Sequence, residues 1–395
     1  MPLKGTKNAY FGILLLGIIS LMGDIVYEGS RGVLPSYLEF LGTSALIAGL
    51  VGGLDLLGYA VRLVTGILAD KTRAYWAFVF IGYGLIVSIP LLGVFTSLEI
   101  VVILVSLERL GKAFRAPSRD AILSIISKGV GVGKAFGIHE LLDQIGGMLG
   151  PLLVFALMLH SNNNYQHTFS FLFLPFLVLL GVLVYAYRKI GSKTIVDTSS
   201  PRGIGEKLAR PFYVYTFAVL LNTVGFIPYT LILFKASEIL EPMNLQWFVP
   251  LFYLLIQGVD APVALISGYA YDKFGTRVLV MPFMLSIFPP LLTLFTTELT
   301  MLLMASIFFG LVLGMQESIY RAAVSELTPI SSRGVAYGIF NTAYGAGLLI
   351  SGALCGFLMI SKPPFIAVIF YVLIVQLMAT FLLLSVGSKL KKRTV

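Results

Sequence analysis

Twelve apolar runs of about 20 residues limit how this chain can fold, because each is long enough to cross the hydrocarbon core of a bilayer as a helix. Of the 395 residues, 57% are hydrophobic and 12% are charged, whereas a typical soluble protein is about a quarter charged. The sequence therefore predicts an all-α membrane protein. The predicted spans are 9–37, 45–69, 75–96, 99–125, 134–159, 168–187, 212–236, 247–271, 278–296, 299–325, 334–360 and 366–387.

The distribution of Lys and Arg predicts the orientation of these spans. If the N-terminus is cytoplasmic, the cytoplasmic loops and tails hold 19 of the 28 Lys and Arg residues, and the other side holds only Lys235 and Lys362. Positive residues concentrate on the cytoplasmic side, so we expect a cell-membrane protein with both termini inside. This bias also explains the net charge of +9 without a nucleic-acid partner. The first run lacks a small-residue cleavage site, so we interpret it as a retained helix.

The two halves of the sequence repeat one another. GILADK (66–71) matches GYAYDK (268–273) at an offset of 202, Arg119 matches Arg321 at the same offset, and GKAFG (133–137) matches GVAYG (334–338) at 201. The longest polar connection separates the halves. We therefore predict an N-terminal six-helix half (1–187), a cytoplasmic central loop (188–211) and a C-terminal six-helix half (212–395). A parallel repeat of this kind is typical of transporters whose halves rock about a midplane site.

These features resemble the major facilitator superfamily. The G-x-x-x-D-[RK] segment after the second span resembles its signature loop, although Arg73 stands where glycine is usual. Arg109 in ERLGKAF resembles the basic residue of its fourth helix, and GGMLGP (146–151) resembles the glycine–proline pattern of its antiporters. More narrowly, RLGKAFRAPSRDAIL and AFGIHELLD resemble a prokaryotic group of poorly characterised facilitators, in which Asp usually replaces Glu108 and a basic residue replaces Glu140. The resemblance implies the facilitator fold and solute transport by alternating access.

The repeated loops predict a cytoplasmic gate, in which Asp70 pairs across the two halves when the cytoplasmic side is closed. The alternative interpretation is that these residues only end helices and set the topology. The predicted gate residues are Gly66, Asp70, Lys71, Asp272, Lys273, Arg119 and Arg321.

Ionisable residues within the spans predict a polar path, because a charged side chain at the bilayer centre costs about 2.5–3.5 kcal/mol. Asp24, Glu28 and Arg31 lie at i, i+4 and i+7 and share a helix face, although Glu28 and Arg31 can simply neutralise each other. Helices 1, 4, 7 and 10 of the superfamily line the transport cavity. The resemblance therefore nominates as cavity residues Asp24, Glu28, Arg31, Arg109, Arg115, Asn222 and Glu317.

A stripe of charged residues follows one face of the fourth span. It consists of Glu108, Lys112, Arg115 and Arg119. Arg109 is turned from this stripe by about 100°, so we expect it to contact a different neighbour. A guanidinium stays protonated, so Arg109 cannot carry a proton, but it can lower the pKa of a nearby carboxylate or hold an anionic substrate.

The fifth span brings together His139, Glu140 and Asp143, whose repeat positions are Phe340, Asn341 and Tyr344. This asymmetry is expected if one half couples to protons and the other shapes a substrate pocket. A histidine beside carboxylates titrates near neutral pH, which suits a proton relay. Static pairing and divalent-metal binding remain alternatives. The candidate proton-coupling residues, with the favoured carriers first, are Glu28, Asp24, Asp143, His139 and Glu140.

The leading functional prediction is a secondary active transporter that exports a small solute in exchange for protons. One alternative is export of a divalent metal through Asp24, Glu28, His139, Glu140 and Asp143; another is a non-transporting receptor or scaffold on the same fold. The sequence contains no phosphate-binding loop, nucleotide fingerprint or nucleophile elbow, which argues against an ATP-driven pump. We therefore expect neither enzymatic activity, nor a cofactor, nor a resident metal, and we expect a monomer.

Overall fold

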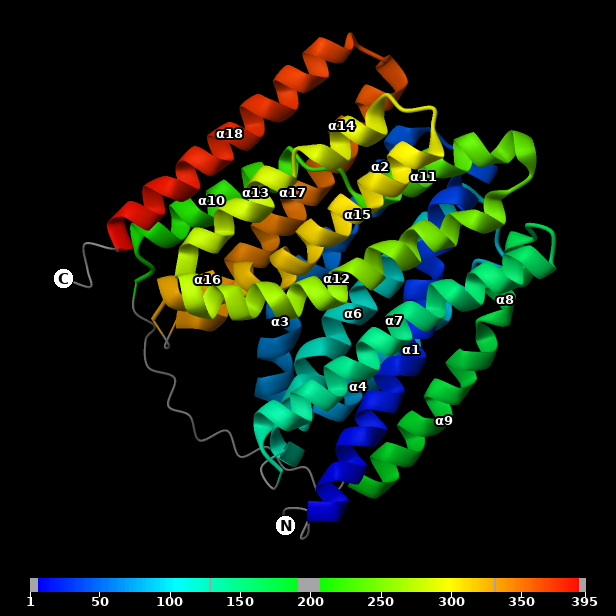
Figure 1. Ribbon diagram of the computed structural model, residues 1–395. Coiled ribbons are helices and arrows are strands. Elements are labelled where there is room, and N and C mark those ends of the chain that lie inside the picture. The colour runs from blue at the N-terminus through cyan, green and yellow to red at the C-terminus, as the bar shows by residue number, and fades with distance from the viewer. Residues whose placement is uncertain (1–5, 128–129, 191–206, 330–331, 391–395) are drawn as a thin grey trace. The chain divides into compact units, whose positions relative to one another are not determined.

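The computed structural model describes residues 6–127, 130–190, 207–329 and 332–390, and within these ranges the chain is helical with short connections (Figure 1). The tails and most of the predicted central loop lie outside these residues. The elements up to residue 190 are α1 (Thr6–Phe40), α2 (Ala45–Gly53), α3 (Asp55–Thr72), α4 (Tyr75–Gly84), η1 (Leu85–Val87), α5 (Ser88–Leu91), α6 (Leu98–Ile126), α7 (Val132–His160), α8 (Tyr165–Phe171) and α9 (Phe173–Ile190).

The second set of elements begins after residue 209. It comprises α10 (Arg210–Val224), α11 (Tyr229–Leu240), η4 (Glu241–Met243), η5 (Gln246–Phe248), α12 (Val249–Phe274), η6 (Gly275–Leu279), α13 (Val280–Leu285), α14 (Phe288–Leu294), α15 (Leu299–Met315), η7 (Gln316–Tyr320), α16 (Arg321–Leu327), α17 (Arg333–Ser361) and α18 (Phe365–Leu390).

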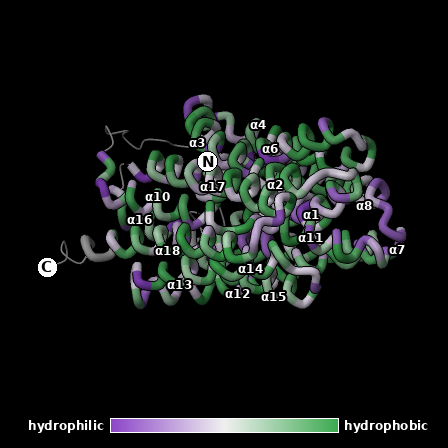
Figure 2. The backbone as a smooth tube through the Cα atoms, turned by 90° about the horizontal axis from the view of Figure 1, so that it is seen from above, coloured by the Kyte–Doolittle hydropathy of each residue, from purple (hydrophilic) through white to green (hydrophobic). Residues whose placement is uncertain are grey.

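The predicted all-α membrane fold is confirmed. Nine stretches of the described residues are long and apolar enough to cross a membrane, and one of them, Gln246–Leu294, covers two predicted spans. The predicted spans at 75–96 and 99–125 correspond to the shorter apolar stretch Tyr75–Leu91 and to the charged helix α6. In Figure 2, hydrophobic residues make up most of the helical tube, and hydrophilic residues gather at connections such as the one between α7 and α8.

Several predicted spans are not continuous α-helices, and two of these interruptions lie beside the polar groups described below. The span 212–236 is interrupted between α10 and α11, where Pro228 precedes the new helix and has no N–H to donate to the preceding turn. The span 299–325 contains η7, a π-helix over Gln316–Tyr320. Single π-turns inside α-helices are frequent at functional sites.

The contacts divide the chain into two compact units. Unit 1 contains the described parts of 1–33 and 60–201, and unit 2 contains 34–59 and the described parts of 202–395. The units differ from the predicted halves at 34–59, which includes α2 and groups with the second half because α2 packs against α17. The predicted division at 188–211 remains a prediction.

Glycines allow α2 and α17 to lie close together within unit 2. A Cβ atom on Gly49 would collide with the backbone of Gly352, and one on Gly356 would lie 2.6 Å from the carbonyl oxygen of Ala45. Small residues at such crossings let helix backbones approach each other, and here they fix α2 against α17.

We expect Gly49→Ala to destabilise the protein by about 1–3 kcal/mol, because overpacking forces helices apart. Gly258→Ala is the matched control, since a Cβ atom there meets nothing within 4 Å and alanine favours a helix by up to about 1 kcal/mol over glycine. Thermal unfolding in detergent measures both. Equal unfolding temperatures for the two variants would show that the α2–α17 crossing tolerates a side chain.

Candidate functional site

Close helix crossings position the ionisable residues of unit 1. A Cβ atom on Gly146 of α7 would lie 2.6 Å from the carbonyl oxygen of Leu21 and 2.8 Å from Cβ of Asp24, both in α1. A Cβ atom on Gly82 of α4 would lie 2.7 Å from the carbonyl oxygen of Gly111 in α6. The GGMLGP segment thus holds α7 directly against α1 beside Asp24, and α4 lies equally close to α6.

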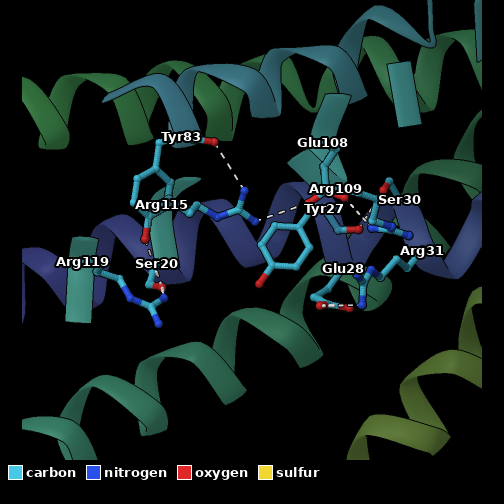
Figure 3. Close-up of polar contacts among 11 residues, drawn as sticks. Ser20, Tyr27, Glu28, Ser30, Arg31, Tyr83, Glu108, Arg109, Arg115 and Arg119 are labelled. Atoms are coloured by element: carbon cyan, nitrogen blue, oxygen red, sulfur yellow. Dashed lines mark hydrogen bonds and ion pairs between the residues drawn. The ribbon is translucent and has the colours of Figure 1, made fainter. Parts of the chain in front are cut away.

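Glu108 joins two arginines at the centre of unit 1. Its carboxylate is fully buried and accepts hydrogen bonds from Nη1 of Arg109 and, at 3.3 Å, from Nη2 of Arg115 (Figure 3). Arg115 also donates to the carbonyl oxygen of Gly82 at 3.4 Å. Arg109 thus contacts Glu108, a residue of the stripe, because a guanidinium next to Glu108 in sequence can fold back onto its carboxylate. That Arg109 also contacts a different neighbour stays a prediction.

The ring of Tyr27 lies among the cations around this cluster. The guanidinium carbon of Arg115 is 4.8 Å from the ring centroid, Nζ of Lys112 is 5.1 Å away and the guanidinium carbon of Arg31 is 5.6 Å away. An aromatic face attracts cations at such distances. Tyr27 thus gives the basic residues of α1 and α6 a common contact that carries no charge.

A second polar group connects α1, α6 and α7. Nη1 of Arg119 donates to Oγ of Ser20 at 2.9 Å and lies 3.6 Å from Oδ2 of Asp143. The same Oδ2 atom lies 3.4 Å from Nδ1 of His139. Asp143 therefore meets a permanent cation and a titratable imidazole through one oxygen. Its Oδ1 atom and Nε2 of His139 are buried and make no hydrogen bond to any described residue.

The other candidate carboxylates differ in their surroundings. Asp24 is buried, and its Cβ atom faces Gly146 of α7, three residues from Asp143. Glu28 forms an ion pair with Arg31 at 3.4 Å (Figure 3). Glu140 is exposed. The structure thus brings Asp24, Asp143 and His139 together, and leaves Glu140 at the surface.

No metal centre is evident among the parts of the chain that the structure describes. Within them, no three His, Cys, Asp or Glu side chains are grouped so that they could hold a metal ion. The geometry therefore gives no support to the divalent-cation alternative.

Unit 2 contains a hydrogen-bond network of neutral side chains. The fully buried Asn222 of α10 donates to Oε1 of Gln376 at 2.7 Å, and the hydroxyl of Tyr320 donates to Oδ1 of Asn222 at 2.9 Å. Gln316 donates weakly to the same Oδ1 at 3.5 Å and accepts from the hydroxyl of Tyr344 at 2.8 Å. The network ties the π-helix η7 to α10, α17 and α18.

A cavity opens next to this network. It encloses roughly 390 Å³, including space open to solvent, and Glu317 contributes to its wall whereas Asn222 does not. Its lining residues are Tyr59, Leu313, Gln316, Glu317, Tyr320, Arg321, Phe340, Asn341 and Tyr344. The cavity thus includes all three positions that the sequence repeat pairs with His139, Glu140 and Asp143.

Five of the predicted gate residues lie within two residues of a helix end: Asp70, Lys71, Asp272, Lys273 and Arg321. Asp70 is exposed near the end of α3 and accepts a hydrogen bond from the hydroxyl of Tyr75 at 2.7 Å. Lys71, Asp272 and Lys273 are also exposed. The repeat partners Arg119 and Arg321 differ, because Arg119 is held in ion pairs and Arg321 is exposed.

Comparison with known proteins identifies the family. The sequence profile of the Major Facilitator Superfamily matches residues 13–241 and 229–394. The chain belongs to this superfamily. An uncharacterized protein of Mycobacterium tuberculosis (strain H37Rv) is 33% identical over 361 residues, which cover 89% of this chain and 87% of the relative. An uncharacterized MFS-type transporter of Methanocaldococcus jannaschii is 27% identical over 373 residues, with coverages of 91% and 90%.

Solved structures of facilitators share the fold. A crystal structure of a mutant of the nucleoside transporter NupG superposes with a TM-score of 0.77 at 13% identity, covering 95% of this chain and 99% of that one. The protein is therefore a member of the superfamily with the membrane-embedded fold of these solved structures.

Sequence reasoning missed several residues of this facilitator's polar groups. Ser20 and Tyr83 contact the Arg119 group, and Gln376 completes the network around Asn222. Gln376 could have been recognised from the sequence, since it is the only amide in the apolar run 366–387. Ser20 and Tyr83 had none, because hydroxyl residues are common in membrane helices and their partners lie 99 and 63 residues away.

Proposed function

We propose that this facilitator is a proton-coupled transporter that exports a small solute, with Asp143 and His139 as the group that binds the coupling proton. The observation that carries the proposal is the shared oxygen of Asp143, which lies 3.4 Å from the imidazole and 3.6 Å from Arg119. In this proposal the transporter acts as a monomer in the cell membrane, with both termini in the cytoplasm.

The chemistry of this group suits proton exchange. A carboxylate beside a cation favours its charged form, and burial without that cation favours the neutral form. Movement of Arg119 relative to Asp143 therefore changes how strongly the pair holds a proton. His139 extends the pair, because its Nδ1 faces Asp143 and its buried Nε2 is available as a second proton site.

As candidate proton carriers, the neighbouring carboxylates Glu28 and Asp24 now rank in a different order from the one that the sequence suggested. Glu28 is already neutralised by Arg31 at 3.4 Å, which favours a static role for this pair. Asp24 is buried beside α7, where Gly146 lies against its Cβ atom, so it is the second candidate carrier.

The proposed direction of transport, export, is based on the resemblance of GGMLGP to the antiporter pattern. The contact of this segment with α1 beside Asp24 supports the proposal. The motifs RLGKAFRAPSRDAIL and AFGIHELLD further favour membership of the prokaryotic subgroup that they resemble. Glu140 stands where the subgroup usually has a basic residue. Because Glu140 is exposed, this difference leaves the contacts of Asp143 with His139 and Arg119 in place.

The gate hypothesis predicts a kinetic defect at Asp70. We expect Asp70→Asn to slow transport several-fold while substrate affinity stays within about threefold, because gating steps can limit turnover without contacting the substrate. Initial rates and affinities measured in proteoliposomes separate the two effects. A large loss of affinity with unchanged turnover would contradict the gate role.

Flux under an imposed pH gradient tests the proposed function. A thermal-shift screen of neutral, anionic and cationic compounds on the purified protein identifies a ligand. Its accumulation in proteoliposomes is then measured with and without an imposed pH gradient. We expect accumulation against the ligand gradient only when the pH gradient is imposed. Accumulation that ignores the pH gradient rules out proton coupling, and a ligand that binds without flux favours the receptor alternative.

A further inference from the structure

We infer that the cavity of unit 2 is a binding site for an uncharged ring compound with hydrogen-bonding substituents. This rests on the proposed function, because it names the class of solute that the transporter carries. The site lies between η7 and α17, with Tyr59 of α3 contributing to its wall.

The walls of the cavity are aromatic and are held in place from behind. The ring of Phe340 stacks on Tyr215 with centroids 6.0 Å apart, and the ring of Tyr320 lies 5.7 Å from Phe283. The ring of Tyr344 meets Tyr59 edge-on at 5.7 Å. Rigid aromatic side chains provide large contact surfaces with little loss of entropy on binding, so these walls favour a flat or ring-shaped solute.

The cavity wall includes neutral hydrogen-bonding groups on Gln316, Asn341 and Tyr344. Tyr344 donates to Gln316 at 2.8 Å, which fixes the direction of both groups. The amide of Asn341 is half-buried on the cavity wall and makes no hydrogen bond to any described residue. A half-buried amide gains stability from a partner that both donates and accepts, so Asn341 is placed to pair with an amide, lactam or hydroxyl of the solute.

Two charged side chains of opposite sign, Glu317 and Arg321, line the cavity. Glu317 and Arg321 are both exposed and lie four residues apart on neighbouring turns. An ion that enters the cavity loses hydration and needs a countercharge at short range, whereas a neutral solute needs only hydrogen bonds. The lining carries one charge of each sign, so a singly charged solute meets a like charge there as well as a countercharge.

Three pyridines that differ only in charge test this inference. Nicotinamide is neutral, nicotinate is an anion and 3-(aminomethyl)pyridine is a cation at pH 7. Saturation-transfer NMR on the purified protein measures their dissociation constants. We expect nicotinamide to bind at least about fivefold more tightly than either ion, as one unpaired charge or hydrogen bond accounts for about 1 kcal/mol or more.

Variants locate the binding to the cavity. We expect Asn341→Leu to weaken nicotinamide binding at least about fivefold, by loss of one paired amide. Thr342→Ala on the same helix is the control: Thr342 is exposed and does not line the cavity, so affinity should stay unchanged. Equal unfolding temperatures of the variants and the unchanged protein exclude misfolding. Tyr59→Leu removes an aromatic wall of the cavity, and we expect it to weaken nicotinamide binding independently of Asn341.

Each contrary result overturns the inference. Preference for nicotinate or the aminomethyl compound shows a charged-solute site, directed by Arg321 or Glu317. Absence of nicotinamide binding, or binding unaffected by both Asn341→Leu and Tyr59→Leu, shows that the cavity is not this site. These binding measurements require no pH gradient. Nicotinamide binding can therefore fail while proton-coupled flux of another ligand is retained. Conversely, nicotinamide can bind although no flux depends on the pH gradient.

Discussion

Glu108→Gln should destabilise the protein by about 3–5 kcal/mol, the loss expected when one partner of a buried ion pair is removed. The carboxylate is fully buried and is the common partner of Arg109 and Arg115, themselves only 3% exposed. Glutamine keeps the shape but leaves two buried guanidinium groups facing each other without the carboxylate between them. Thermal or denaturant unfolding in detergent measures the loss.

Glu99→Gln is the matched control, because Glu99 lies on the same helix but is exposed, and its replacement should change stability by less than about 1 kcal/mol. A double variant with Arg115→Gln gives a sharper test. If the cluster acts as a unit, Arg115→Gln is less harmful when Glu108 is already replaced, since coupled residues are not additive. Strict additivity would contradict the cluster.

Asp143→Asn should abolish accumulation driven by a pH gradient while keeping exchange at equal pH within about threefold, because exchange needs no net proton movement. Asparagine retains the shape of the side chain but cannot take up or release a proton at neutral pH. Proteoliposomes loaded with the ligand from the thermal-shift screen measure both quantities on the same preparation.

Asp120→Asn provides the control for this result. Asp120 contacts the same Arg119 at 3.0 Å but its side chain is 46% exposed, so its neutralisation should leave coupling intact. Should Asp143→Asn, Asp24→Asn and Glu28→Gln all keep full gradient-driven accumulation, these carboxylates are structural pairs or substrate ligands, and coupling runs elsewhere.

Hydrophobic length and charge spacing accounted for much of what the sequence predicted. The apolar runs fixed the spans because a lipid environment requires every backbone polar group to bond within its own helix. The spacing of His139 and Asp143 put them one turn apart, and the structure joins them at 3.4 Å. Helical periodicity gives such local pairs because residues i and i+4 lie on one face.

Helical periodicity did not anticipate one contact. The angular offset of Arg109 suggested a partner apart from the stripe, yet a long side chain next to Glu108 reaches its carboxylate. The face on which a Cα atom lies does not fix where a flexible four-bond side chain places its charge.

The sequence by itself determined that this chain is a bundle of membrane helices in two repeated halves, and which of its residues carry charge into that bundle. Only the tertiary structure decided that Glu108 holds two arginines, that α2 packs on α17 through glycine contacts, and that Asn222 pairs with Gln376 across 154 residues. The physical reason is that periodicity specifies which side of a helix is polar, whereas the neighbour that this side meets depends on helix packing, and packing is set by small-residue contacts between segments far apart in the chain.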